Sequence, residues 1–340
     1  MTIPLALCVF LMSATITRIL VKNAEKIAAI DVPNERSSHA TPTPRGGGLA
    51  FVISSIVGFA ILLAKPEISK SEFGALIVAG LLVALTGYLD DHQKISGASI
   101  RLVIHALGAI VILGFIGVPS DFEIFRFHVQ SGIVLAIFGV LYLVWLLNLF
   151  NFMDGTDGIA ASEAIFVCVT GALLNLHTTS NSSNSNGALI LASAVIGFIL
   201  YNWSPAKIFM GDIGSGYLGI VIGGLSLMSA KQNPDLFWVW IILLGVFVSD
   251  ATVTLIRRLA RKKKPHVAHR SHAYQHLAIK LNSHAKVSLI VLAVNVVWLA
   301  PIAFLVSDNA LNGSSGAVLA YVPLVPAMIA LGSGKDSLAS

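Results

Sequence analysis

Long runs of apolar residues recur along the whole chain and alternate with short polar segments. A helix needs about 20 apolar residues to cross the hydrocarbon core of a bilayer. About eleven runs approach that length, near residues 2–21, 47–64, 73–89, 100–118, 132–150, 159–177, 187–201, 216–230, 237–256, 287–306 and 315–332. Pro323 and Pro326 weaken the last run, so ten spans remain an alternative. The pattern predicts an all-α polytopic membrane protein with 10 or 11 transmembrane helices, in which residues 1–340 form a single domain.

The composition excludes the ordinary soluble classes. Hydrophobic residues make up 56% of the 340 positions and charged residues only 11%, whereas an ordinary soluble domain has about 25% charged residues. Cys8 and Cys168 both lie in apolar runs, which excludes an extracellular disulfide scaffold. The first run has no basic residue before it and no small-residue cleavage site after it, so we expect a retained anchor and not a signal peptide.

The distribution of basic residues predicts the orientation, because Lys and Arg are enriched in cytoplasmic loops. No basic residue precedes the first run, whereas Arg18, Lys22 and Lys26 lie at its end. We therefore expect a periplasmic N-terminus. The loops at 22–46, 90–99, 151–158, 202–215 and 257–286 are then cytoplasmic. Only four of the 22 basic residues fall on the outer side: Lys65, Lys70, Arg126 and Lys231. On that side, 178–186 resembles polar filler and 122–129 alternates like a short hairpin.

Two cytoplasmic helix ends carry candidate chemistry. Asp90 and Asp91 are adjacent carboxylates, and if the helix continues, Asp90 shares a face with Lys94. The alternative is a solvated helix end with one weak ion pair. After the fifth run, four polar residues recur every three positions, which predicts that they line one side of a helical or 3₁₀ turn: Asn148, Asn151, Asp154 and Asp157. The alternative there is an ordinary capped turn.

Two further loops add an acid and several bases. Asp212 stands alone between glycines beside an apolar run, where acids usually bind an ion or take part in catalysis; a turn aspartate is the alternative. The basic run at 257–264 is typical of contact with anionic lipid. The residues that follow suit phosphate contact better, namely Arg270, His272 and His276. Asp250, inside the ninth run, needs a partner, and a structural ion pair is as plausible as a functional role.

Carboxylates and cationic donors on one membrane face are the groups needed for Mg²⁺-assisted phosphoryl transfer. Their motifs occur in order: Asp-Asp-x-x-Lys at 90–94, Asn-x-x-Asn-x-x-Asp-Gly-x-Asp-Gly at 148–158, Phe-Met-Gly-Asp-x-Gly-Ser at 209–215, and the histidine-bearing loop. Together they resemble the polyprenyl-phosphate N-acetylhexosamine-1-phosphate transferase family, over about residues 30–285. The resemblance implies transfer of a sugar-1-phosphate from a UDP-N-acetyl sugar to undecaprenyl phosphate, with release of UMP, at the bacterial inner membrane.

The resemblance also implies roles for individual residues. Asp212 matches the metal-binding aspartate, for Mg²⁺ with Mn²⁺ as the alternative, and Phe209 matches the aromatic residue that stacks on uracil. The expected catalytic residues are Asp90, Asp91, Asp154, Asp157 and His272. The other expected substrate-binding residues are Asn148, Asn151, Lys94, Arg270 and His276.

The histidine spacing departs from the pattern of one branch of the family and so favours another branch. The UDP-MurNAc-pentapeptide branch has three consecutive histidines, whereas here the sequence at 268–277 is Ala-His-Arg-Ser-His-Ala-Tyr-Gln-His-Leu. This spacing is more similar to the branch that initiates O-antigen or related polysaccharides, including its 6-deoxy sugar subgroup. Three rivals remain: the pentapeptide branch, a eukaryote-type dolichol enzyme and a secondary transporter, although the acids lie at one face and no internal repeat is evident. No nucleic-acid partner is expected, and a homodimer is left open.

Overall fold

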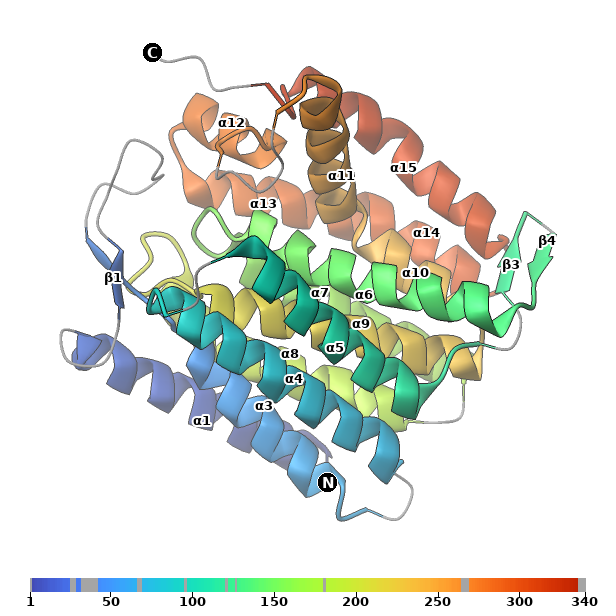
Figure 1. Ribbon diagram of the computed structural model, residues 1–340, viewed down its shortest axis with the longest axis horizontal. Helices are drawn as coiled ribbons and strands as arrows, with labels where there is room; N and C mark the ends of the chain where they lie inside the picture. The colour runs from blue at the N-terminus through green and yellow to red at the C-terminus, as the bar shows by residue number, and fades with distance from the viewer. Residues whose placement is uncertain are drawn as a thin grey trace.

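The computed structural model describes residues 2–24, 29–31, 42–65, 69–94, 97–119, 122–125, 127–179, 182–263 and 269–335. Helices dominate these residues (Figure 1). They are α1 (Thr2–Lys22), α3 (Gly48–Leu62), α4 (Lys70–Asp91), α5 (Ala98–Ile116), α6 (Gly132–Met153), α7 (Ile159–Thr178), α8 (Ser183–Asn202), α9 (Asp212–Gln232), α10 (Asp235–Leu243), α11 (Gly245–Ala260), α12 (Ala273–Leu281), α13 (His284–Val294), α14 (Ala300–Ser307) and α15 (Gly313–Ala330). A π-helical turn, η1 (Asn295–Leu299), joins α13 to α14.

The helices confirm the all-α membrane class. Among the described residues, nine helices are long and apolar enough to cross a bilayer, counting α13, η1 and α14 as one. The ninth predicted run, over 237–256, is not one straight helix, because α10 and α11 are bent by 73° relative to each other at Leu244. Counted together, this pair makes a tenth span. The second predicted run, near 47–64, forms the shorter α3 of 15 residues.

Helix α9 lies at the centre of the bundle and is completely buried over its 18-residue apolar window. Glycines make this possible, because they allow neighbouring helices to approach its backbone closely. A Cβ atom at Gly219 would lie 2.6 Å from the Leu146 carbonyl oxygen on α6, and one at Gly223 would lie 2.6 Å from a methyl carbon of Leu143. The core is therefore built around α9, whose first residue is Asp212.

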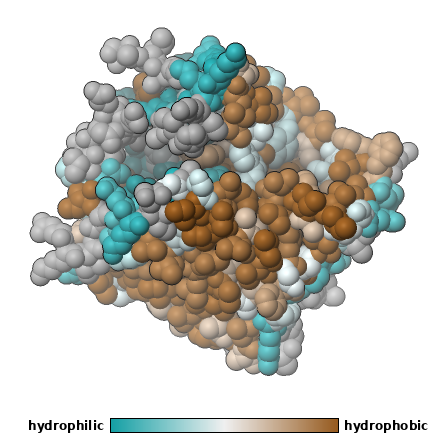
Figure 2. All heavy atoms as spheres, in the orientation of Figure 1, coloured by the Kyte–Doolittle hydropathy of each residue, from teal (hydrophilic) through white to brown (hydrophobic). Residues whose placement is uncertain are grey.

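The two ends of the bundle differ. Strands β1 (Ala29–Asp31) and β2 (Thr43–Arg45) pair at the end that also carries α12, on the left of Figure 1. Strands β3 (Phe122–Ile124) and β4 (Phe127–Val129) form the predicted hairpin at the opposite end. Hydrophobic side chains cover the middle of the visible face, and hydrophilic ones gather towards its margins (Figure 2).

The segment 178–186 is not simply polar filler. Helix α8 begins within it at Ser183, and Asn184 is buried against α9, where its side-chain amide donates to the Leu225 carbonyl oxygen at 2.9 Å. The same amide contacts Ser229. Asn184 therefore satisfies a backbone carbonyl and a hydroxyl group of α9, as buried polar groups generally must.

Candidate active site

The end of α4 meets the beginning of α9, and this contact places two of the predicted acids together. Both Asp91 oxygens accept hydrogen bonds from backbone N–H groups of α9: Oδ1 from Asp212 at 3.0 Å and Oδ2 from Ile213 at 3.2 Å. A carboxylate at a helix N-terminus satisfies orphan donors and interacts favourably with the helix dipole. The Asp91 side chain is only 1% exposed, so Asp91 holds α4 and α9 together at this point.

Arg45 joins Asp91 to Asp212. Its Nε lies 2.9 Å from Asp91 Oδ1 and its terminal Nη2 lies 2.8 Å from Asp212 Oδ1. Burial disfavours the charge on Arg45, but Asp212 and Asp91 outweigh this effect and raise the pKa of its guanidinium above the ordinary value. Glycines 46–48 bring this arginine close to the loop before α9: Gly47 N–H donates to the Phe209 carbonyl at 2.8 Å and Gly48 N–H to that of Met210 at 2.9 Å.

Asp90 pairs with an arginine that the sequence analysis did not single out. Arg101, in the first turn of α5, lies 2.7 Å from Asp90 Oδ2 and 3.9 Å from Asp212 Oδ2. The predicted partner, Lys94, does not share a helical face with Asp90 because α4 ends at Asp91 and Gln93 has a positive φ of 56°. Lys94 is exposed just beyond the helix end.

Asn151 contacts Asp212, whereas the other three polar residues of the 148–157 motif have different partners. The Asn151 side-chain amide donates to Asp212 Oδ1 at 2.9 Å. Asn148 donates to its own helix, to the Val144 carbonyl at 2.7 Å. Because α6 ends at Met153, the four polar residues do not line one side of a continuous turn, and that expectation is wrong. We call Asp90, Asp91, Asp212, Arg45, Arg101 and Asn151 the acidic cluster.

Asp154 and Asp157 follow α6 and have opposite electrostatic environments. Burial raises the pKa of Asp154 well above its ordinary value; Arg45 opposes that rise, and Asp212 and Asp91 add to it. Burial also tends to raise the pKa of Asp157, but His284 and the Ala206 N–H lower it overall. Asp157 lies 3.1 Å from the His284 ring and accepts the Ala206 N–H at 3.1 Å.

Asp157 therefore links three segments: the start of α7, the start of α13 and the loop that carries Phe209. The Phe209 N–H in turn donates to the carbonyl of Pro44 in β2 at 2.8 Å, and Phe209 is half-buried. Phe209 thus connects the loop at 202–211 to the strand that carries Arg45. The residues predicted to bind the nucleotide, Asp154, Asp157 and Phe209, thus lie in the same region of the protein, and each is held by different contacts.

Asp250 lies on α11 and caps the start of α12. Its Oδ1 accepts the Ala273 N–H at 2.8 Å and its Oδ2 accepts the Tyr274 N–H at 3.0 Å. The His272 ring lies 3.4 Å from Oδ1 and is almost fully buried. Asp250 thus fixes both the helix and the predicted catalytic histidine.

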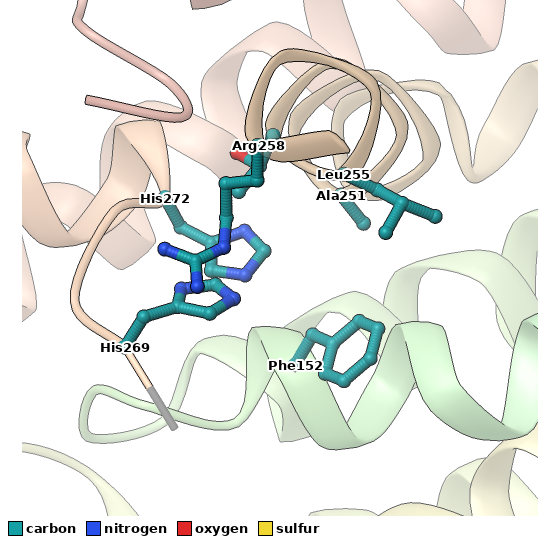
Figure 3. Close-up of a pocket in the computed structure, with 7 residues that line it drawn as sticks. Phe152, Ala251, Leu255, Arg258, His269 and His272 are labelled. Atoms are coloured by element: carbon teal, nitrogen blue, oxygen red, sulfur yellow. The ribbon is translucent and has the colours of Figure 1, made fainter. Parts of the chain in front are cut away.

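His272 lines a small pocket between α6, α11 and the segment before α12 (Figure 3). Its ring stacks on that of His269, with centroids 5.2 Å apart, and the Arg258 guanidinium lies beside them. Phe152 and Leu255 provide apolar walls. The pocket is therefore lined by a guanidinium and two imidazole rings on one side and by apolar side chains on the other.

The remaining predicted residues lie around α12. Arg270 precedes the helix, next to the buried Ser271. His276 is on the helix, and its Nε2 lies 3.2 Å from the Lys335 carbonyl oxygen, so its ring faces the turn after α15. Sequence reasoning missed the roles of Arg45 and Arg101. The available signals were the triple glycine after Arg45 and the position of Arg101 near the start of a span.

The acidic cluster has donor chemistry that fits a hard divalent cation. The Asp90 and Asp212 carboxyl groups are in contact, and like charges that close favour a cation or a proton between them. In the described part of the chain, no three His, Cys, Asp or Glu side chains are arranged to hold an ion. Mg²⁺ commonly binds one or two carboxylates together with water and substrate phosphates, and the cluster fits that mode.

Comparison with known proteins identifies the family. Residues 73–230 match the model of glycosyl transferase family 4. The chain is 34% identical over 302 residues to the probable undecaprenyl-phosphate N-acetylglucosaminyl 1-phosphate transferase of Bacillus subtilis, covering 84% of this chain and 83% of that protein. It is 29% identical over 318 residues to the decaprenyl-phosphate N-acetylglucosaminephosphotransferase of Mycolicibacterium smegmatis (83% and 75% covered). It is 27% identical over 235 residues to the phospho-N-acetylmuramoyl-pentapeptide-transferase of Streptococcus pneumoniae (67% and 70% covered). The chain therefore belongs to glycosyl transferase family 4, the polyprenyl-phosphate N-acetylhexosamine-1-phosphate transferases.

Proposed function

We propose that the protein transfers an N-acetylhexosamine-1-phosphate from its UDP-sugar to undecaprenyl phosphate. The products are an undecaprenyl-diphosphate sugar and UMP. The observation that carries this proposal is the acidic cluster, in which three aspartates and two arginines from four segments meet at one end of a membrane bundle. Phosphoryl transfer depends mainly on such positioning and charge neutralisation.

The reaction we favour is a single displacement. An oxygen of the lipid phosphate attacks the phosphorus next to the sugar, and the bond from that phosphorus to the UMP oxygen breaks. The bond between sugar and oxygen stays intact, so the anomeric configuration is kept. A covalent aspartyl-phosphate route is the alternative.

The cluster supports a division of roles between its aspartates. Asp212 would hold Mg²⁺, or Mn²⁺ as the alternative, and a bound divalent ion would neutralise charge on the diphosphate. Asp91 already accepts two N–H groups and Arg45, so accepting a proton would weaken these hydrogen bonds. Asp90 is 17% exposed and pairs with Arg101. We therefore favour Asp90 as the carboxylate that meets the lipid phosphate.

The donor would lie across the neighbouring segments. Phe209 would stack on uracil, and Asp154, Asp157 and Asn148 would shape the nucleotide pocket. The diphosphate and sugar would face the segment before α12, where Arg258, His269 and His272 surround the pocket of Figure 3. Arg270 and His276 would extend that basic surface, and Lys94 would approach the lipid phosphate.

The spread histidines of the last cytoplasmic loop support the pathway that we propose, and the family resemblance supports the location. We place the protein in a bacterial inner membrane, at the first step of O-antigen or related polysaccharide synthesis. The sugar is then N-acetylglucosamine or a 6-deoxy N-acetyl sugar. UDP-MurNAc-pentapeptide is the competing donor, because a pentapeptide transferase is among the similar proteins.

The test measures UMP release by the purified protein in detergent. Undecaprenyl phosphate and Mg²⁺ are supplied with one donor at a time: UDP-GlcNAc, a UDP-6-deoxy-N-acetyl sugar or UDP-MurNAc-pentapeptide. We expect release only with both lipid and metal, loss on addition of EDTA, and recovery on adding excess Mg²⁺. An Asp212→Asn variant should lose release while keeping its melting temperature. Release of UMP without lipid, or none with any donor from folded protein, would contradict the proposal.

A further inference from the structure

The chain turns sharply after α15 and packs against the segment that carries His272. The five residues Leu331–Lys335, which we call the α15 turn, contain two left-handed glycines, Gly332 with φ +96° and Gly334 with φ +75°. Glycine adopts such values without steric cost and often ends helices in this way. Between the two glycines, Ser333 is completely buried.

The α15 turn makes hydrogen bonds to α11, to α12 and to the segment that carries His272. The Ser333 hydroxyl donates to Asp250 Oδ1 at 3.1 Å, the same oxygen that accepts the Ala273 N–H and lies 3.4 Å from His272. The Gly334 N–H donates to the Ser271 carbonyl at 2.7 Å. These two contacts act directly on the carboxylate that caps α12 and on the residue before His272.

Two arginines of α11 hold the turn from the other side. Arg257 donates to the Ser333 carbonyl at 2.5 Å, and Arg261 donates to the Gly334 carbonyl at 3.0 Å. His276 on α12 contacts the Lys335 carbonyl at 3.2 Å. The turn therefore joins α11, α12 and the segment between them, although none of its own side chains lines the pocket.

From these contacts we propose that the α15 turn is a positioning element: it holds His272 and the start of α12 in the geometry that donor binding needs. This role rests on the proposed function. Backbone hydrogen bonds from three sides limit the local opening of a short surface segment. When the turn is absent, the segment at 269–272 retains its helix cap from Asp250 but loses its contact with α15.

The first experiment compares two shortened chains with the full chain. One ends after Ala330 and lacks the turn, whereas the matched control ends after Lys335 and keeps it. Trypsin cleavage after Arg270 is followed by mass spectrometry and normalised to cleavage after the exposed Lys22 of α1. We expect the chain without the turn to be cut after Arg270 at least about tenfold faster, since local opening exposes that bond. The KM for the donor should rise, and UMP release at a donor concentration well below KM should fall by at least about tenfold in the same chain.

A pair of glycine variants tests the same role without shortening the chain. A Cβ atom at Gly334 would lie 2.7 Å from the Arg257 Cβ, whereas one at Gly332 would have no neighbour closer than 3.7 Å. Both glycines have positive φ, so Gly332→Ala controls for backbone strain. We expect Gly334→Ala to increase cleavage after Arg270 and to lower UMP release more than Gly332→Ala does.

The outcomes separate this role from the proposed function. Equal cleavage ratios in the chains that end after Ala330 and after Lys335 would overturn the role of the turn, as would equal effects of the two glycine variants. Faster cleavage after Arg270 with no UMP release from the full chain would support the positioning role and contradict the proposed reaction. Faster cleavage together with unchanged UMP release would overturn the claim that the segment must be held for activity.

Discussion

Replacing Gly87 with alanine tests whether the close approach of α4 to α9 builds the acidic cluster. A Cβ atom at Gly87 would collide with the backbone of Asp212 and Ile213. Ordinary carbon contacts would require the two helices to separate by about 1 Å. The hydrogen bonds from Asp212 N–H at 3.0 Å and Ile213 N–H at 3.2 Å to Asp91 would then exceed the limit of about 3.5 Å.

The expected effect on activity is much larger than the effect on stability. Overpacking costs about 1–3 kcal/mol, and the better helix propensity of alanine returns up to about 1 kcal/mol. The free energy of unfolding should therefore fall by roughly 0–2 kcal/mol. A displacement of about 1 Å at reacting groups can lower a rate by about 100-fold. Gly87→Ala should therefore reduce UMP release by about two orders of magnitude while the protein stays folded.

Gly74 on the same helix provides the matched control. A Cβ atom at Gly74 would have no neighbour within 4 Å, so Gly74→Ala changes helix propensity without changing the packing against α9. Both variants are compared by UMP release with saturating donor and lipid, and by thermal unfolding in detergent. If Gly87→Ala keeps UMP release within about twofold of Gly74→Ala, the contact between α4 and α9 does not position groups needed for the proposed transfer, and the reasoning is refuted.

Three further changes test individual contacts. Arg45→Lys keeps the charge but cannot bridge two carboxylates with separate nitrogens, so UMP release should fall by about tenfold and a normal rate would argue against the bridge. Burial tends to raise the pKa of Asp157, but His284 lowers it overall, so its stabilising effect is present above the ordinary carboxyl pKa and is lost as pH falls through the lowered value. The melting temperature of Asp157→Asn should accordingly decline less than that of the parent below about pH 4, and parallel curves would exclude this linkage. Glu163 accepts the Asn295 amide at 2.5 Å, while its Oε1 and the Asn295 Oδ1 are buried without partners. Glu163→Gln should keep the melting temperature, whereas Glu163→Leu should lose about 1–3 kcal/mol of stability; equal stability of the two variants would show that the pair contributes nothing.

The sequence predicts the fold well because a membrane span is a local property of about 20 residues. Each of the eleven predicted runs overlaps a helix in the structure. The break in the ninth run was not predicted, because Leu244 and Gly245 lie in a continuously apolar stretch and hydropathy does not report direction. The end of α4 at Asp91 lies close to the predicted start of the loop at 90–99, whereas the conditional pairing of Asp90 with Lys94 required one more helical turn.

The candidate site could be predicted only in part, because an acid in a sequence does not reveal its partner. Asp212 stood out as a lone carboxylate beside an apolar run. Its partners Arg45 and Asn151 come from segments distant in sequence, and only the packing of α3, α6 and α9 brings them together. Asp250 shows the opposite case: its burial in a span is typical of a functional acid, yet its oxygens are used to cap α12.

The location of the acidic cluster follows from the first turn of α9. The first N–H groups of a helix lack partners and attract negative charge, and Asp91 supplies that charge from α4. Glycine is required on both sides of this contact, because a Cβ at Gly87 would meet α9 and a Cβ at Gly48 would meet the backbone of Gly214. The close packing that brings α3 and α4 to α9 thus also brings Arg45 and Asp90 to Asp212. In this bundle the glycines at the helix ends allow the backbones of three helices to come into contact. The charged residues that flank these glycines therefore lie together at one end of the bundle.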